Sequence, residues 1–173
     1  MAPHDLPQSP SPARPVGAAM RLLKQWEGCR LTAYLDSAGV VTIGFGTTRY
    51  ENRQRVQMGD TITQAQAESL LEVQAARFAE EVDNLTRDDL TERQLDALTS
   101  FAYNLGTVQF RGSTLRQRVN TNPNDPDIRV QFLRFHKAKG RPIYGLWRRR
   151  HAEGDVYFGT TTPCPTPPFP VSR

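Results

Sequence analysis

The hydrophobic residues near the start of the chain recur at the spacing of a helix. Four of them occupy positions i, i+3, i+4 and i+7 of one helical face: Ala19, Leu22, Leu23 and Trp26. Gly28 follows at the position where a glycine in the left-handed conformation commonly ends a helix. The pattern therefore predicts a short helix that presents Glu27 at its carboxyl end.

The segment after this helix has the composition of strands. Residues 31–35 and 40–45 are rich in β-branched and aromatic residues. Between them, residues 36–39 are Asp, Ser, Ala and Gly, which favour a tight turn. Gly44 and Gly46 indicate irregular backbone where the second strand ends. We therefore expect a small antiparallel hairpin.

Helical spacing returns at Thr63 and continues through the rest of the folded part. Thr63 and Gln66 have the spacing of a capping box, and the apolar stripe that follows predicts one long helix. A second capping box, Thr91 and Gln94, opens a helix that ends at Gly106. Further helices are expected at three later places: after Ser113, from Pro126 at the first helical position, and over 143–157.

This order of elements predicts an α+β fold that is mostly α, with two lobes. The small lobe covers about 17–62, a connecting helix about 63–84, and a helical lobe about 85–159. Proline-rich segments flank this domain at 1–16 and 160–173, and we expect them to be extended or disordered. A cleft between two lobes is a natural binding site.

The composition fits a globular protein of one domain, with 173 residues, 38% hydrophobic and 23% charged. No apolar run approaches the ~20 residues of a membrane helix, so we expect no stable membrane insertion. Residues 1–16 lack the hydrophobic centre of a secretory signal. A net charge of +4 and a pI of 9.4 are compatible with an anionic polymer as partner, either cell wall or nucleic acid.

Cysteine and histidine residues offer little chemistry. Cys29 and Cys164 are too few for a disulfide framework, so we expect free thiols and leave a single bridge open. His4, His136 and His151 lack the spacing of metal ligands, so we expect no metal.

Glu27, Asp36 and Thr42 all fall within the predicted helix and hairpin, and they are candidates for acid–base chemistry. Glycoside hydrolysis uses one carboxyl group to protonate the leaving oxygen and a second to activate or position a water. A threonine hydroxyl can help to hold that water. Spacing alone leaves other roles open: a solvated Glu, an Asp that caps the turn, and a Thr that only favours the strand.

The segment 26–48, WEGCRLTAYLDSAGVVTIGFGTT, resembles the phage-type lysozymes of glycoside hydrolase family 24. Many members read E-G-x-R-L-x-A-Y-x-D-x-x-G-x-x-T-I-G-Y-G-H-T. The catalytic Glu, Asp and Thr of the family then fall on Glu27, Asp36 and Thr42 without a gap. One position departs from the pattern, because Thr47 stands where many members have His.

Two further blocks agree with this resemblance, in family order. FAYNLG at 101–106, followed by Phe110 and STL at 113–115, resembles one block, and GLWRRRHAE at 145–153 resembles the other. The resemblance implies a lysozyme-like fold and substrate contacts from four residues: Tyr103, Asn104, Thr48 and Thr114. It also implies an arginine that reaches toward Glu27, with the choice among Arg148, Arg149 and Arg150 left open.

The resemblance implies an inverting muramidase that cleaves peptidoglycan between N-acetylmuramic acid and N-acetylglucosamine during lysis of a bacterial host. We expect a monomer that needs no cofactor, is made in the host cytoplasm and acts in the periplasm, where a separate membrane-permeabilising protein admits it. Two alternatives keep the fold: a non-catalytic peptidoglycan-binding module and a lytic transglycosylase. A nucleic-acid binder is disfavoured, since no recognised motif is present and the two terminal arms carry few basic residues.

Overall fold

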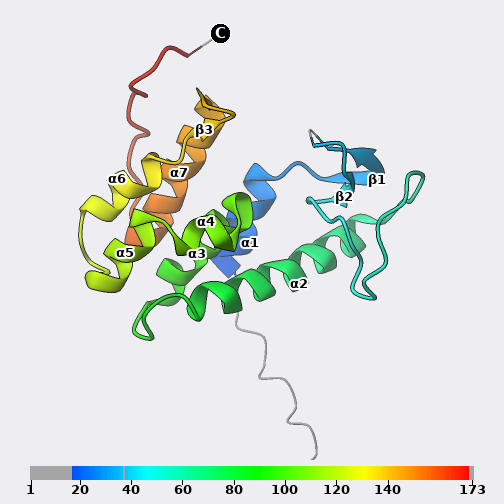
Figure 1. The fold of residues 1–173 in the computed structure, drawn as a ribbon, viewed down its shortest axis with the longest axis horizontal. Helices are drawn as coiled ribbons and strands as arrows, with labels where there is room; N and C mark the ends of the chain where they lie inside the picture. The colour runs from blue at the N-terminus through cyan, green and yellow to red at the C-terminus, as the bar shows by residue number, and fades with distance from the viewer. Residues whose placement is uncertain (1–16, 37, 172–173) are drawn as a thin grey trace, which may run out of the picture.

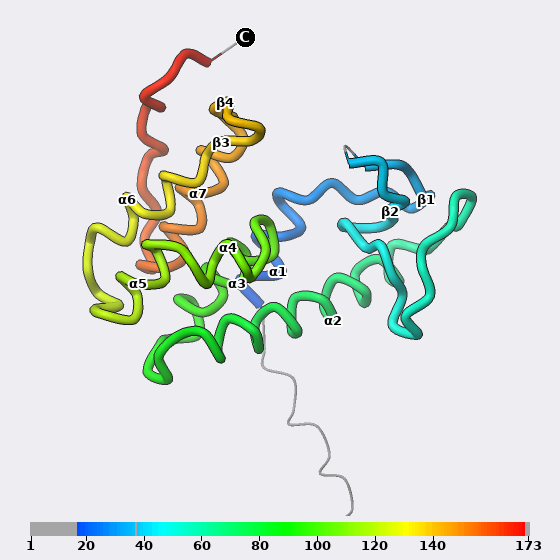
Figure 2. Tube along the Cα trace, viewed as in Figure 1, coloured from blue at the N-terminus to red at the C-terminus, as the bar shows by residue number. Residues whose placement is uncertain are grey.

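The computed structural model describes residues 17–36 and 38–171, and its chain path is shown in Figures 1 and 2. Most of the elements are helices, as the sequence predicts. In chain order the elements are α1 (Gly17–Trp26), β1 (Arg30–Leu35), β2 (Val41–Gly44), α2 (Gln64–Asp83), α3 (Glu92–Leu105), α4 (Thr107–Arg111), α5 (Thr114–Thr121), α6 (Asp127–Leu133), β3 (Lys137–Ala138), β4 (Arg141–Pro142) and α7 (Tyr144–Phe158).

The small lobe is built around the β1–β2 hairpin. The strands are antiparallel, with Tyr34 opposite Thr42 and Leu35 opposite Val41. Ala33, Ile43 and Val56 form the buried centre of this lobe. The register shifts between Arg30 and Tyr34, so the strand bends at the end nearer to α1.

Helix α2 runs along the molecule from the hairpin to the helical lobe, as Figure 2 shows. Both predicted capping boxes are present: Thr63 with Gln66 at the start of α2, and Thr91 with Gln94 at the start of α3. The core of the helical lobe surrounds Phe101, which makes edge-to-face contacts with the rings of Phe110 and Phe132. In the described part of the chain, no helix combines the length and apolar composition needed to cross a membrane.

Several local features differ from the sequence predictions. Gly28 is not among the glycines with positive φ, so the prediction of a left-handed cap after α1 was wrong. Helix α6 begins at Asp127, one residue later than expected, because the Asp125 side chain accepts the Asp127 N–H and Pro126 precedes the helix. The short helix α4 and the β3–β4 hairpin were not predicted, since segments this short carry little periodicity.

The described part of the C-terminal segment, 160–171, is extended and packs onto the helical lobe. The Phe169 ring stacks on His136, with ring centroids 5.0 Å apart, and meets Trp147 edge-on at 5.8 Å. Trp147 Nε1 donates to the carbonyl oxygen of Pro165 at 2.9 Å. Cys164 in this segment is a free, exposed thiol, as is Cys29. The predicted N-terminal arm, 1–16, lies outside the described residues.

Candidate active site

Helix α1 places Glu27 at its carboxyl end. The backbone N–H of Glu27 still donates to Leu23 at 2.8 Å, which continues the helical pattern one residue past Trp26. Leu22 and Leu23 are buried and pack the helix against the rest of the protein. The Glu27 side chain is 24% exposed, so its carboxyl group lies half-buried at the surface of the protein.

The amino end of α1 is held by α3. Asp96 is buried on α3 and accepts a hydrogen bond from the backbone N–H of Ala18 at 2.9 Å. Burial raises the pKa of the Asp96 carboxyl, and the backbone N–H groups of Ala18 and Ala19 oppose that rise. Sequence reasoning missed Asp96, because its partner lies 78 positions away. This contact anchors the helix that carries Glu27 to the helical lobe.

Arg149 is the arginine that faces Glu27. Its Nη1 donates to Glu27 Oε1 at 2.6 Å, and its side chain is 4% exposed. Successive residues of a helix point about 100° apart, so the two flanking arginines point elsewhere. Arg148 is exposed and lies over the Trp26 ring, whereas Arg150 is fully buried over the Phe101 ring.

Asp36 and Thr42 are brought together by the turn of the hairpin. Asp36 Oδ1 accepts the backbone N–H groups of Ala38 and Val40, each at 2.8 Å, so one carboxylate oxygen caps the turn. Thr42 is buried, and its hydroxyl donates to the carbonyl oxygen of Val40 at 3.0 Å. Within the described residues, neither side chain makes a direct hydrogen bond to Glu27. Asp36 Oδ2 remains available for a water or substrate.

Tyr103 joins the two lobes. Its hydroxyl lies 2.9 Å from the carbonyl oxygen of Phe45 and 3.1 Å from Gln74 Oε1. Gln74 in turn donates to the hydroxyl of buried Thr47 at 2.7 Å. Thr47, which departs from the family pattern, therefore belongs to a neutral hydrogen-bonded chain. Burial raises the pKa of Tyr103, and the charge of Glu27 adds to that rise.

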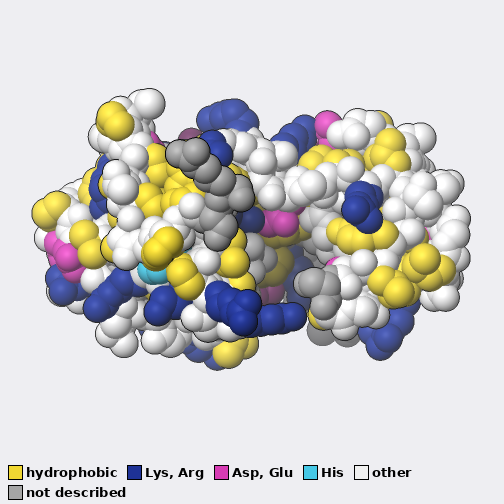
Figure 3. All heavy atoms as spheres, turned by 90° about the horizontal axis from the view of Figure 1, so that it is seen from above, with side chains coloured by type: hydrophobic (Ala, Val, Ile, Leu, Met, Phe, Trp, Pro, Cys, Tyr) yellow, Lys and Arg dark blue, Asp and Glu magenta, His cyan; other side chains and the backbone are white. Residues whose placement is uncertain are grey.

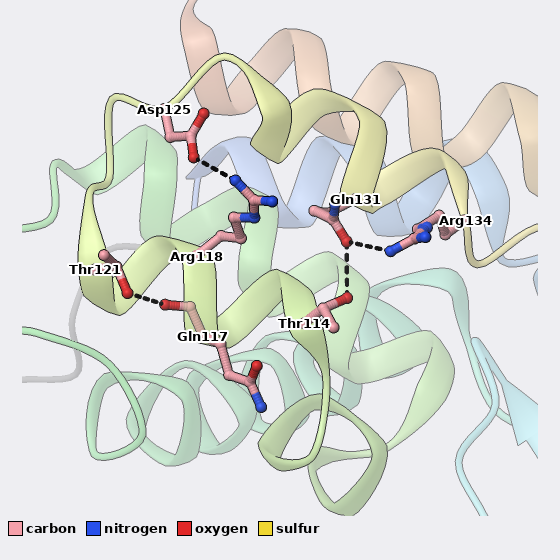
Figure 4. Close-up of a pocket in the computed structure, with 7 residues that line it drawn as sticks. All are labelled: Thr114, Gln117, Arg118, Thr121, Asp125, Gln131 and Arg134. Atoms are coloured by element: carbon pink, nitrogen blue, oxygen red, sulfur yellow. Dashed lines mark hydrogen bonds and ion pairs between the residues drawn. The ribbon is translucent and has the colours of Figure 1, made fainter.

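The other predicted substrate contacts lie in different places. Asn104 is half-buried in the last turn of α3. Thr48 is exposed and lines a hollow of about 560 Å³ in the small lobe, together with Arg49 and Arg55. Thr114 lines a separate groove of about 420 Å³ between α5 and α6, where its hydroxyl donates to Gln131 Oε1 at 2.7 Å (Figure 4).

The space-filling view shows a hollow between the two lobes, with acidic side-chain atoms visible in it (Figure 3). A small hairpin lobe and a helical lobe, joined by one long helix, carry carboxyl groups suited to glycoside chemistry. The fold and this arrangement define a lysozyme-like glycosidase.

Comparisons with known proteins agree with this class. The family model described as phage lysozyme matches residues 24–153. An endolysin of Acyrthosiphon pisum secondary endosymbiont phage 1 is 37% identical over 140 residues, which cover 79% of this chain and 92% of that protein. The endolysin of Salmonella phage P22 is 38% identical over 128 residues, which cover 74% of this chain and 87% of that protein.

A solved structure agrees as well. The endolysin from Escherichia coli O157:H7 phage FAHEc1 matches with a TM-score of 0.75 at 32% identity, and the match covers 90% of this chain and 99% of that one. The chain therefore belongs to the phage lysozyme family, a family of glycoside hydrolases. The predicted family and fold class are confirmed.

Proposed function

We propose that this protein is an inverting muramidase that hydrolyses the β-1,4 bond between N-acetylmuramic acid and N-acetylglucosamine in peptidoglycan, with Glu27 as the general acid. The observation that carries the proposal is the placement of Glu27. Its Oε1 is held by Arg149, while its side chain remains 24% exposed. Among the described residues Oε2 meets no donor, so this oxygen is free to deliver a proton to the glycosidic oxygen.

Asp36 and Thr42 take the second half of the reaction. They hold and activate a water on the opposite face of the sugar ring, and this water attacks the anomeric carbon as the glycosidic bond breaks. The proton of Glu27 goes to the leaving oxygen, and the proton of the water goes to Asp36. Both residues hydrogen-bond to the backbone of Val40, which ties their side chains to the same turn. Inversion requires the two carboxyl groups to be about 6.5–9.5 Å apart to admit that water.

Substrate contacts come from both lobes. We assign Asn104 and Tyr103 to sugar binding at the end of α3, and Thr48 and Thr114 to the outer parts of the glycan or its attached peptide. The Tyr103 hydroxyl is already engaged with Phe45 and Gln74, so its contribution to binding comes from the ring. The positive net charge favours approach to an anionic wall polymer.

The proposed setting is lysis of a bacterial host by a phage. The protein is made in the host cytoplasm and acts as a monomer on the wall in the periplasm, which it reaches through a separate membrane-permeabilising protein. A cofactor is not required for this chemistry, because both proton transfers are made by side chains of this chain.

Identification of the ends released from purified peptidoglycan tests this proposal. Mass spectrometry should find reducing N-acetylmuramic ends that have gained one water. Anhydro ends would assign the protein to the lytic transglycosylases. Binding to the wall with no new ends would make it a non-catalytic wall-binding module.

A further inference from the structure

A second buried carboxylate lies behind the arginine that faces Glu27. Glu153 is on α7, one turn after Arg149, and its side chain is 0% exposed. Its Oε1 accepts three donors: Ser100 Oγ at 2.8 Å, Arg149 Nε at 3.2 Å and Arg150 Nη2 at 2.8 Å. A fully buried Glu is rare unless it is paired, and these three contacts provide that pairing.

These contacts fix the orientation of the Arg149 guanidinium. Nε donates to Glu153, and Nη2 donates to the carbonyl oxygen of Ser100 at 3.3 Å. A guanidinium group is planar and rigid, so fixing two of its nitrogen atoms fixes the third. The remaining nitrogen, Nη1, is thereby directed at Glu27 Oε1, 2.6 Å away.

The buried cluster formed by Glu153, Arg149, Arg150 and Ser100 is a poor source of stability. Among the described residues, Glu153 Oε2 and two nitrogen atoms of Arg150, Nε and Nη1, are buried without a hydrogen-bond partner. Burial lowers the pKa of Arg150, and the nearby carboxylate of Glu153 opposes that effect. Replacing such buried ion pairs by apolar residues is often neutral or stabilising. A role in the chemistry of Glu27 explains the cluster better than a role in folding.

The charges around Glu27 show what that role is. Arg149 contacts Glu27 directly, and Arg150 lies within electrostatic reach of it, both from α7. From α3, Tyr103 adds no charge, because burial raises its pKa and the charge of Glu27 adds to that rise. Two buried cations therefore lie on one side of a carboxyl group that must deliver a proton. Glu153 is the charge that offsets them.

We propose that Glu153 is a positioning residue for the general acid: it aims Arg149 at Glu27 and offsets part of the Arg149–Arg150 charge beside that carboxyl group. This inference rests on the proposed role of Glu27. Glu153 acts through Arg149 and does not contact Glu27 itself.

The test compares pH–activity profiles of charge variants on soluble peptidoglycan fragments. Glu153→Gln retains an oxygen that can accept from Ser100 and Arg149 but removes the negative charge. The positive charge then left without its counter-charge should move the basic limb of the kcat profile to lower pH by about half a unit or more. Arg150→Gln removes a positive charge and should move the same limb to higher pH. The double variant should return it close to the wild-type position.

Ser100→Ala is the matched control. It removes one hydrogen bond to Glu153 and leaves all charges in place, so it should lower the melting temperature without moving the basic limb. If Glu153→Gln does not fold, the opposite shift of Arg150→Gln decides the question alone. The proposal is overturned if Glu153→Gln and Arg150→Gln change kcat equally at every pH, which would mark a structural role. A Glu27→Gln variant with full activity would instead refute the proposed function itself.

Discussion

The hydroxyl of Tyr103 lies 2.9 Å from the carbonyl oxygen of Phe45 and so joins α3 to the residue that follows β2. These residues are 58 positions apart and belong to different lobes. The Tyr103 ring also packs against Phe78 on α2, with centroids 5.1 Å apart. One side chain therefore contacts both lobes and the helix that connects them.

Tyr103→Phe should remove the hydrogen bonds that connect the lobes through this side chain while leaving the packing of its ring intact. The change leaves the Phe45 carbonyl and the Gln74 amide oxygen without this donor, so the free energy of unfolding should fall by about 1–2 kcal/mol. Urea denaturation measures this difference. Tyr144→Phe, at an exposed tyrosine, is the control and should be neutral. Equal stability of the two variants would show that the Tyr103 hydroxyl does not hold the lobes together.

The C-terminal segment should stabilise the fold through its hydrogen bonds to the Asp155 carboxylate. This contribution should be present near neutral pH and lost in acid. Burial alone would raise the pKa of Asp155, but its hydrogen bonds from the Thr162 backbone and from Arg129 outweigh this and lower the pKa. A carboxyl group with a lowered pKa stabilises the fold above its unfolded pKa and loses that contribution as the pH falls through its folded pKa.

Asp155→Asn should therefore lower the melting temperature near neutral pH, and the difference from wild type should shrink below about pH 4. Differential scanning calorimetry across this range provides the measurement. The surface variant Asp88→Asn serves as a control for a general change of charge. A difference for Asp155→Asn that is constant with pH would contradict the assigned cause of the pKa shift.

The Thr42 hydroxyl should matter more for catalysis than the rest of its side chain. Thr42→Ser keeps the hydroxyl, whereas Thr42→Val keeps the shape and removes the hydrogen bond to Val40. If Thr42 helps to hold the attacking water, Thr42→Val should lower kcat by about tenfold or more, and Thr42→Ser should retain most of the activity. Equal activity of the Val variant and wild type would remove Thr42 from the mechanism.

The features that the sequence predicts correctly are those recorded in local patterns. The two capping boxes place the starts of α2 and α3 because Thr63 and Thr91 each have their Gln partner three residues later. The contacts of Asp36 and Thr42 with Val40 are likewise confined to one turn between neighbours in the sequence, while the catalytic roles of Asp36 and Thr42 stay predictions.

Contacts between distant segments could not be predicted in the same way. The periodicity of α7 shows that three consecutive arginines must diverge, but the choice of Arg149 depends on where α1 ends in space, 122 positions earlier. The support that Asp96 gives to α1 and that Glu153 gives to Arg149 appears only once α3 and α7 are packed together. The missing left-handed cap at Gly28 shows that a single glycine does not fix the conformation of a helix end.

The most direct test of the account is the rate at which Glu27→Gln releases reducing ends from peptidoglycan, measured beside its binding to the same material. Gln keeps the shape of Glu27 and can still accept from Arg149, but it has no proton to give to the glycosidic oxygen. The account predicts wild-type folding and wall binding, with activity lower by a factor of about 10² or more. A Glu27→Gln protein that cleaves peptidoglycan at the wild-type rate would contradict it.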